Sequence, residues 1–329
     1  MGAATGKPIH KGSSLAAIVH PVKDTKQSAR LAEVNTPLQF SVWRKYLADH
    51  PDEAFREYIL EGIQRGFRVG FDYQGNKCHL AAGNLKLARE NAGAVEEYIA
   101  KEVAARRVVG PLTPGEVPGL QTSPFGVIPK RQPGKWCLIV DLSAPEGGSV
   151  NDRINCGLCS LLYVSVEDIV HKIERMGKGT LLVKVNMKAY RMVPVHPQDR
   201  PLLGMEWEGQ VYVDTALPFG LRSAPKIFNA LADALEWIVR HRGILEVDHY
   251  LDDFIIIGPP QSKGCANSLE VLLETCRQLG VPVAVHKCQG PTTCLEFLGI
   301  EIDTIAMELR LPQEKLTRLH KNTDRGVAP

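Results

Sequence analysis

Two adjacent carboxylates, Asp252 and Asp253, are the residues whose types and spacing most directly suggest chemistry in this 329-residue chain. The strand-like segment 245–249 precedes them and the apolar run 254–257 follows, so they occupy the turn of an expected hairpin. Asp is common in turns, and an ordinary solvated turn is therefore one interpretation. Paired carboxylates at a hairpin tip also bind hard divalent cations such as Mg²⁺, which leave room for waters and substrate phosphates. The neighbouring segments decide between these interpretations.

Helices and short strands together would position this hairpin. Asp52 and Gly66 mark the two ends of one expected helix. Ser223, as N-cap, and Pro225, in the first turn, begin a longer helix that runs to Arg240. Two more helices are expected over 94–106 and 266–279, and strands over 125–129, 136–140, 181–185, 281–285, 297–302 and 308–311, with a hairpin within 199–216. Because hairpins are mixed with helices, the sequence predicts an α+β fold.

Composition and pattern divide the chain into four segments. Residues 1–35 are polar and have no hydrophobic period, which predicts a disordered leader. A helical N-terminal segment is expected over 36–110 and the main domain over 111–311. Residues 312–329 would form a short tail.

The formal net charge is +2, which does not by itself indicate a nucleic-acid-binding protein. Its distribution is more informative. Residues 101–140 contain six Lys and Arg against two Glu, a net of +4, and residues 231–253 contain six Asp and Glu against two Arg, a net of −4. A basic region beside an acidic one suits a polyanion held near a bound metal, and ordinary surface variation is the alternative.

The eight cysteines bear on the cellular compartment. Residues 1–30 lack the apolar core of a signal peptide, and reduced thiols in an intracellular protein, cytoplasmic or nuclear, are the expectation. Cys156 and Cys159 have zinc-like spacing, but no second pair at matching spacing completes a four-ligand site. No apolar stretch approaches the roughly 20 residues of a membrane span.

Five motifs follow one another in a fixed order along the main domain. They are 123–130 together with 134–142, Ala189-Tyr190 within 189–195, Leu217-Pro218-Phe219-Gly220 within 217–225, Tyr250-Leu251-Asp252-Asp253, and Phe297-Leu298-Gly299. In this order they resemble the reverse transcriptases of retroelements. The resemblance is greatest to the polymerases of DIRS-type, tyrosine-recombinase retrotransposons, with long-terminal-repeat elements as near relatives, and it covers residues 36–311.

The resemblance implies a right-hand polymerase with fingers and palm, built as an antiparallel sheet with packed helices and preceded by a helical lobe. The thumb would be largely absent, because thirty residues follow Gly299, as in a piece of a larger polyprotein. The implied activity is that of an RNA-directed DNA polymerase, a nucleotidyltransferase that uses Mg²⁺ or Mn²⁺. The implied partners are an RNA or DNA template with a DNA primer, and deoxynucleoside triphosphates, with no membrane.

The resemblance also implies roles for charged residues. Asp252 and Asp253 would be catalytic and would bind the metal. Lys130 and Lys135 would contact the triphosphate, and Lys287 would protonate the leaving pyrophosphate as a general acid. Lysine is usually exposed, so solvated surface charges remain the alternative for all three.

Three further residues are implied to bind substrate. Tyr190 would lie beneath the sugar and exclude a 2′-hydroxyl, although a buried core tyrosine is the alternative. Phe219 and Gly220 would belong to the loop and helix under the template and the incoming nucleotide.

The first palm motif departs from the family pattern, which is Asp, three residues, then Ala-Tyr. Aligned on the strand 181–185, Asn186 stands in place of the aspartate; aligned on Ala189-Tyr190, the position falls on Val185. Neither alignment supplies a carboxylate, and one residue is missing before Tyr190. A one-residue slip reverses the faces of a strand, so we expect a bulge or turn near Met187 to absorb it.

These departures bear on activity. Asn186 removes a full negative charge from the expected metal site, and Cys137 stands where the family commonly has an arginine that contacts phosphate. The sequence therefore predicts a polymerase domain that is impaired in this copy. The alternative is a catalytically inactive, nucleic-acid-binding remnant of such a polymerase.

Overall fold

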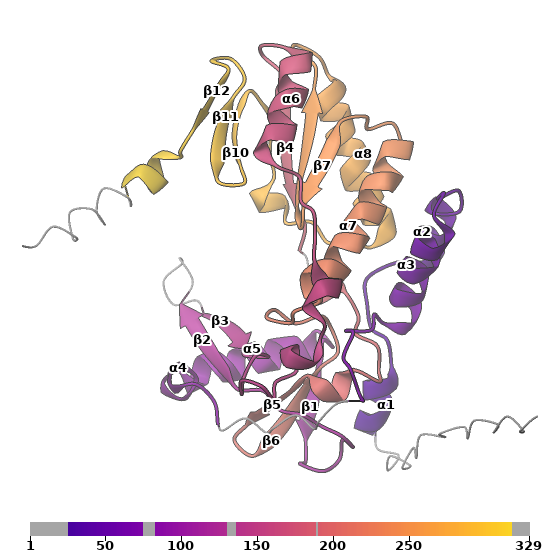
Figure 1. Ribbon diagram of the computed structural model, residues 1–329, viewed down its shortest axis with the longest axis vertical. Helices are drawn as coiled ribbons and strands as arrows, with labels where there is room; N and C mark the ends of the chain where they lie inside the picture. The colour runs from indigo at the N-terminus through magenta and orange to yellow at the C-terminus, as the bar shows by residue number, and fades with distance from the viewer. Residues whose placement is uncertain (1–25, 75–82, 130–135, 189, 318–329) are drawn as a thin grey trace, which may run out of the picture.

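The computed structural model describes residues 26–74, 83–129, 136–188 and 190–317, and it arranges them in two groups of elements (Figure 1). Antiparallel sheets and packed helices occur in both groups, which confirms the predicted α+β class. None of the described helices combines the length and the apolar character needed to cross a bilayer.

The upper group in Figure 1 is built on a four-stranded antiparallel sheet. Its strands, in spatial order, are β7 (Val247–Tyr250), β8 (Asp253–Gly258), β4 (Leu181–Asn186) and β9 (Gln289–Thr292). The three helices beside it are α6 (Val166–Met176), α7 (Ala224–His241) and α8 (Gly264–Leu279). A separate three-stranded sheet consists of β10 (Cys294–Phe297), β11 (Ile300–Asp303) and β12 (Glu308–Arg310).

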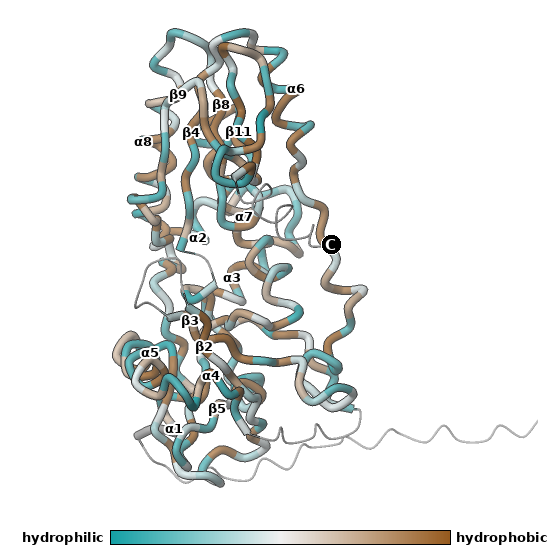
Figure 2. The backbone as a smooth tube through the Cα atoms, turned by 90° about the vertical axis from the view of Figure 1, so that its left-hand side faces the viewer, coloured by the Kyte–Doolittle hydropathy of each residue, from teal (hydrophilic) through white to brown (hydrophobic). Residues whose placement is uncertain are grey.

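Alternate side chains of β4 and β8 enter two different hydrophobic cores, because successive residues of a strand point to opposite faces. Val183 and Phe254 belong to the larger core, together with buried residues of α7 and α8. Leu182 and Ile255 belong to a smaller core with α6, β10 and β11. Figure 2 shows α8 and α6 on opposite sides of these strands. The register of β4 against β8 is thereby specified from both sides.

The lower group contains two small sheets and two helices (Figure 1). One sheet has the order β1 (Val108–Leu112), β6 (Gln210–Asp214) and β5 (Gly204–Trp207), and the other pairs β2 (Phe125–Pro129) with β3 (Trp136–Val140). The helices are α4 (Lys86–Glu90) and α5 (Ala92–Ala104). β5 and β6 form the expected hairpin, with Glu208 and Gly209 at positive φ in its two-residue turn.

Three N-terminal helices precede these elements, namely α1 (Lys26–Ala32), α2 (Phe40–Tyr46) and α3 (Glu53–Arg65). Asp52 caps α3 as predicted, since its side chain accepts a hydrogen bond from the Phe55 amide. α2 packs against the end of α8, where the indole of Trp43 donates to the Leu279 carbonyl at 3.0 Å. α2 is thus attached to the upper group, whereas α1 contacts β1 of the lower group.

Part of the expected leader is helical. Residues 26–32 form α1, whereas residues 1–25 lie outside the described part of the chain. The buried guanidinium of Arg200 donates to the carbonyls of Leu31 (2.5 Å) and Glu33 (2.8 Å) and so holds the end of this helix. The prediction was wrong here because a contact 169 residues away in sequence stabilises a segment that has no hydrophobic period of its own.

Two expected strands are also wrong. Pro282 lacks an amide hydrogen, and of residues 281–285 only Val283 makes an isolated bridge, to Met187. The segment 297–302 contains a turn, with Leu298 and Gly299 at positive φ, which divides it between β10 and β11. Apolar residues alone did not reveal either interruption.

Ser223 stands at the predicted N-cap position of α7 but does not cap it. Its backbone is helical (φ −83°, ψ −11°), and its side chain makes no capping hydrogen bond. A capping side chain requires an extended backbone at this position. Pro225 lies in the first turn as expected, and the helix ends at His241.

A buried ion-pair network holds the segment that follows β4 on the lower group. The Arg191 guanidinium lies 2.9 Å from Glu102 on α5 and 2.6 Å from Asp214 on β6. Glu102 also accepts two hydrogen bonds from Arg107. Burial alone would raise the pKa of Glu102, but Arg107 and Arg191 outweigh it and lower that pKa to about 2.

A second buried contact joins the β7–β8 hairpin to α7. The His249 ring, on β7, lies 2.7 Å from Glu236 and 3.3 Å from Asp233, and it stacks on Phe254. Burial disfavours the imidazolium, yet the two carboxylates outweigh burial and raise the pKa of His249 to about 9. His249 is therefore charged at neutral pH and fixes the hairpin on the helix.

His249→Gln tests this contact. The His249 pKa is 6.5 ordinarily and about 9 in the fold, so the stabilisation is complete below pH 6.5 and is lost as the pH rises through 9. We expect the variant to lower the free energy of unfolding by on the order of 2 kcal/mol at pH 6, and by much less at pH 9.5. Urea denaturation at both pH values measures this. His241→Gln, at an exposed histidine at the end of α7, is the control. An equal loss of stability at both pH values for His249→Gln would contradict the assignment.

Candidate active site

The two carboxylates lie at the tip of the β7–β8 hairpin, as predicted. Tyr250 pairs with Asp253, and Leu251, at φ +51°, and Asp252 form the two-residue turn between them. The Asp252 carbonyl accepts a hydrogen bond from the Met187 amide at 2.8 Å. This contact fixes the hairpin tip against the end of β4, so both carboxylates are held beside the last residue of that strand.

Asn186 is that last residue, and it pairs directly with Asp253. Its side-chain amide nitrogen donates to Asp253 Oδ1 at 2.6 Å and to Asp252 Oδ2 at 3.0 Å. Val185, the position given by the other alignment, is fully buried in the core on the opposite face of the sheet. The structure thus identifies Asn186 as the residue that faces the carboxylate pair.

The segment after Asn186 shows how the shorter sequence is accommodated. Met187 leaves the β4–β8 ladder and bridges to Val283, and the Lys188 amide donates to the Pro282 carbonyl at 2.8 Å. Residue 189 lies outside the described residues. The backbone therefore departs from the sheet at Met187, where we expected the slip to be absorbed.

Lys184 also lies at the carboxylate pair, and the sequence analysis missed it. Its ammonium group is 3.3 Å from Asp253 Oδ2. Lys184 precedes Asn186 by two positions on β4, so both side chains project from the same face of the strand. The two-residue spacing between Lys184 and Asn186 could have indicated this from the sequence. It points to Asp253 only once the pairing of β4 with β8 is known.

The electrostatics at Asp252 reflect burial first and repulsion from Asp253 second. Burial raises the pKa of Asp252, and the charge of Asp253 raises it further. The amide of Asn186 and the charge of Lys287 act in the opposite direction. Lys287 is exposed on the short helix η5 (Val285–Lys287), close enough for its charge to act on Asp252.

Tyr190 faces this site from the short helix η3 (Tyr190–Met192). Its ring packs at 5.1 Å from the ring of Phe219 and at 5.3 Å from that of Phe228. Burial, followed by the negative charge of Asp252, raises the pKa of Tyr190 to about 12. Tyr190 is therefore a neutral, half-buried aromatic next to the carboxylate pair.

The loop that carries Phe219 and Gly220 is held by Asn151. Asn151 donates to the Gly220 carbonyl and accepts from the Arg222 amide, both at 2.8 Å. Gly220 has φ +89°, and a Cβ there would lie 2.8 Å from the Val140 carbonyl oxygen. These contacts leave the Phe219 ring half exposed beside Tyr190.

Other predicted residues lie elsewhere. Lys130 and Lys135 fall outside the described residues. Cys137, on β3, is half-buried and lines a cavity with Tyr98, Arg191 and Phe219. It is thus on the same side of the lower group as the Phe219 loop.

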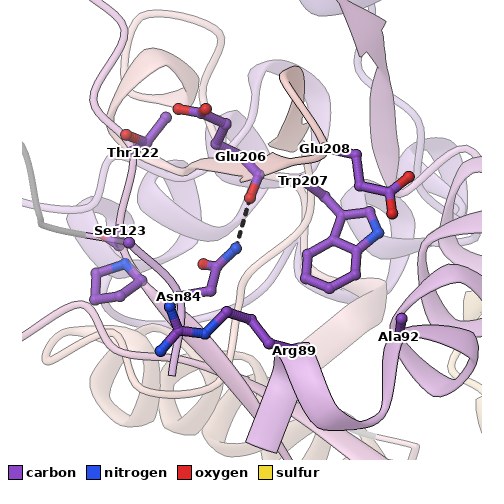
Figure 3. Close-up of a pocket in the computed structure, with 10 residues that line it drawn as sticks. Asn84, Arg89, Ala92, Thr122, Ser123, Glu206, Trp207 and Glu208 are labelled. Atoms are coloured by element: carbon purple, nitrogen blue, oxygen red, sulfur yellow. Dashed lines mark hydrogen bonds between the residues drawn. The ribbon is translucent and has the colours of Figure 1, made fainter. Parts of the chain in front are cut away.

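A second cavity, of about 510 Å³, lies in the lower group and is shown in Figure 3. Asn84 spans it, donating to the Glu206 carbonyl at 2.7 Å and accepting from the Phe125 amide. Arg89 and Trp207 complete its wall. None of the predicted site residues that the structure describes lines this cavity, so it is separate from the carboxylate pair.

The donor set at the hairpin tip limits what it can bind. Two carboxylates supply hard oxygen ligands of the kind that one divalent ion takes. Within the described ranges, no cluster of three or more His, Cys, Asp or Glu side chains has a metal-binding arrangement. The residues therefore fit one divalent ion and do not supply the third carboxylate that a pair of ions would share.

The chain matches the family model for reverse transcriptase (RNA-dependent DNA polymerase) over residues 128–302. It is 24% identical over 182 residues to the Pro-Pol polyprotein of Feline foamy virus, an alignment that covers 55% of this chain and 14% of that protein. It is 24% identical over 213 residues to the retrovirus-related Pol polyprotein from transposon 412 of Drosophila melanogaster, covering 63% of this chain and 14% of that protein. The chain thus spans a small part of these relatives.

Solved structures of similar fold include a foamy viral protease-reverse transcriptase in complex with dsDNA. That likeness has a TM-score of 0.60 at 16% identity and covers 88% of this chain and 59% of the other. The same type of protein in complex with an RNA/DNA hybrid gives a TM-score of 0.57 at 13% identity, over 85% of this chain and 37% of the other. These likenesses confirm the predicted α+β fold of the fingers-and-palm type.

Asn151→Ala tests how the Phe219 loop is held. The substitution removes two hydrogen bonds to that loop, so we expect a loss of about 2 kcal/mol in the free energy of unfolding. Asn155→Ala, at an exposed position that caps a short helix, is the matched control and should cost about 1 kcal/mol or less. Urea denaturation compares the two, and equal losses would show that Asn151 has no special role.

Proposed function

The chain belongs to the reverse transcriptase (RNA-dependent DNA polymerase) family, and on that basis we propose that it is the fingers-and-palm part of a retroelement polymerase. Its reaction is template-directed nucleotidyl transfer. The observation that carries the proposal is the carboxylate pair at the β7–β8 tip, held opposite the last residue of β4. The finer assignment to a DIRS-type element stays a prediction from the motifs.

The proposed substrates are an RNA or DNA template with a DNA primer, and deoxynucleoside triphosphates. Support comes from the foamy viral structures of similar fold, which contain dsDNA or an RNA/DNA hybrid. In this chain the half-exposed Phe219 ring lies beside Tyr190, so an aromatic surface borders the carboxylate pair. Bases and sugars pack favourably on such rings.

The residues around the hairpin take distinct proposed roles. Tyr190 lies beneath the nucleotide sugar, where its ring leaves little room for a 2′-hydroxyl. Phe219 and Gly220 support the templating base pair; a side chain at Gly220 would displace the loop from Val140. Lys287 is exposed near Asp252, in a place from which an ammonium group can neutralise or protonate a leaving pyrophosphate. Lys130 and Lys135 remain candidates for triphosphate binding.

Asp252 and Asp253 are the residues that would hold a divalent ion, Mg²⁺ or Mn²⁺. When bound, such an ion neutralises the charge of the phosphates and polarises the reacting oxygens. The protein's own contribution is to fix the two carboxylates through the β7–β8 turn and the Met187 contact.

Asn186 makes nucleotidyl transfer slow in this chain. An amide carries no charge, and here its nitrogen faces both carboxylates as a donor. The loss of one carboxylate from a metal site in a low dielectric weakens transition-state stabilisation by several kcal/mol, about a thousandfold in rate. We therefore propose a polymerase domain whose activity is impaired at Asn186.

A second candidate function is primer–template binding without extension. The contacts of Asn186 favour it, because they satisfy the carboxylates within the protein and leave the surface around Tyr190 and Phe219 intact. The two candidates share one fold and differ in whether the chemistry proceeds.

Asn186→Asp tests the proposed function. The substitution restores a carboxylate opposite Asp253, and we expect primer extension with Mn²⁺ or Mg²⁺ to rise about a hundredfold or more above that of the unchanged chain. Extension on a defined primer–template measures this, with filter binding of the same duplex in parallel. Asn155→Asp, which adds the same charge at the exposed cap of a short helix, is the matched control and should change nothing.

Three outcomes separate the candidates. A gain confined to Asn186→Asp supports the polymerase and its defect at position 186. Duplex binding by the unchanged chain and by Asn186→Asp, without extension by either, supports the second candidate. Efficient extension by the unchanged chain would refute the proposed impairment.

A further inference from the structure

Lys184 pairs with a carboxylate that belongs to the proposed metal site. Among the described residues, Asp253 is the acidic side chain in ion-pair contact with Lys184, at 3.3 Å. The two side chains are 20% and 26% exposed, so water screens this pair only in part. The contact is therefore stronger than an ordinary surface ion pair.

The geometry of the sheet places Lys184 within reach of Asp253. β4 pairs with β8 so that Asn186 lies opposite Asp253 and Lys184 lies opposite Ile255. Residues 184 and 186 project from the same face, and Asp253 projects from that face on the neighbouring strand. A long side chain at position 184 is thus a diagonal neighbour of Asp253 on the same face of the sheet and can reach its carboxylate.

The protein's own donors engage both oxygens of Asp253. Oδ1 accepts from the Asn186 amide at 2.6 Å, and Oδ2 lies 3.3 Å from the Lys184 ammonium group. Asp252 Oδ2 accepts from the same amide at 3.0 Å. β4 thus supplies one positive charge and one amide donor that offset the two negative charges, and the charge of Lys287 on η5 adds to them at Asp252.

We propose that Lys184 is a built-in counter-ion of Asp253 that, together with the Asn186 amide, takes the place of a divalent cation and weakens metal binding. This inference rests on the proposed function only in taking Asp252 and Asp253 as the metal ligands. A divalent ion that binds the pair must displace the ammonium group from Oδ2 or bind beside it, against its charge. Restoring a carboxylate at position 186 corrects the donor set but leaves this positive charge in place.

The proposal predicts a gain in metal affinity when the charge is removed. Lys184→Met keeps much of the length and apolar character of the side chain and removes the ammonium group. We expect the variant to bind Mn²⁺ about tenfold more tightly than the unchanged chain, because a positive charge near the ligands no longer opposes the ion. Electron paramagnetic resonance of free Mn²⁺, titrated with the full chain and without nucleic acid or nucleotide, measures the affinity.

Lys172→Met is the matched control. Lys172, on α6, also pairs with carboxylates, at 2.5 Å from Asp248 and 3.5 Å from Glu246, but not with the hairpin-tip pair. Its removal should leave Mn²⁺ affinity unchanged, whereas Lys184→Arg, which keeps the charge, should behave like the unchanged chain. Adding Asp253→Asn to Lys184→Met should abolish the gain. Equal Mn²⁺ affinity in Lys184→Met and the unchanged chain, or an equal gain in Lys172→Met, would overturn the proposal.

Thermal unfolding gives a second readout that does not involve catalysis. Without the counter-ion, the two carboxylates repel each other. Lys184→Met should therefore melt at a lower temperature than the unchanged chain in a chelator, and its melting temperature should rise again when Mn²⁺ is added. The unchanged chain should respond little to either treatment, and the same response from both proteins would count against the counter-ion. Primer extension and duplex binding take no part in these measurements, so failure of this proposal and failure of the proposed function are distinguishable.

Discussion

The pairing of β4 with β8 is the constraint on which the rest of the structure depends. Six residue pairs, from Leu181 with Gly258 to Asn186 with Asp253, fix which side chains enter each core. Val183 and Phe254 are buried against α7 and α8 on one face, and Leu182 is buried against α6 on the other. A slip of one residue would exchange the two faces, so hydrophobic burial on both sides holds the polar residues at the open end of the sheet in register.

Buried charges connect this sheet to its surroundings. Arg191 directly follows Tyr190 and contacts Glu102 and Asp214, so the segment that carries the aromatic ring at the site is anchored to the lower group. His249 acts similarly for the hairpin, which it holds on α7. Removing one member of such a buried pair leaves an uncompensated charge, and that penalty is what makes these connections specific.

Local sequence patterns predicted much of the fold, and their failures have identifiable causes. The helix capped by Asp52 and the hairpin that turns at Glu208 form because the residues that specify them lie within a few positions of one another. Ser223 does not cap its helix, since its backbone is helical where a capping residue needs an extended one. α1 forms because Arg200, distant in sequence, holds its last carbonyls. No local pattern contains those contacts.

For the candidate site too, some features follow from the sequence and others only from the tertiary structure. The sequence by itself determined the carboxylate pair, the aromatic residues Tyr190 and Phe219, and the absence of a third carboxylate, because residue identity and motif order need no coordinates. Only the tertiary structure decided that Asn186, rather than Val185, faces the pair, and that Lys184 contacts Asp253. The physical reason is that facing and contact are properties of strand register, and two hydrophobic cores built from distant segments set that register.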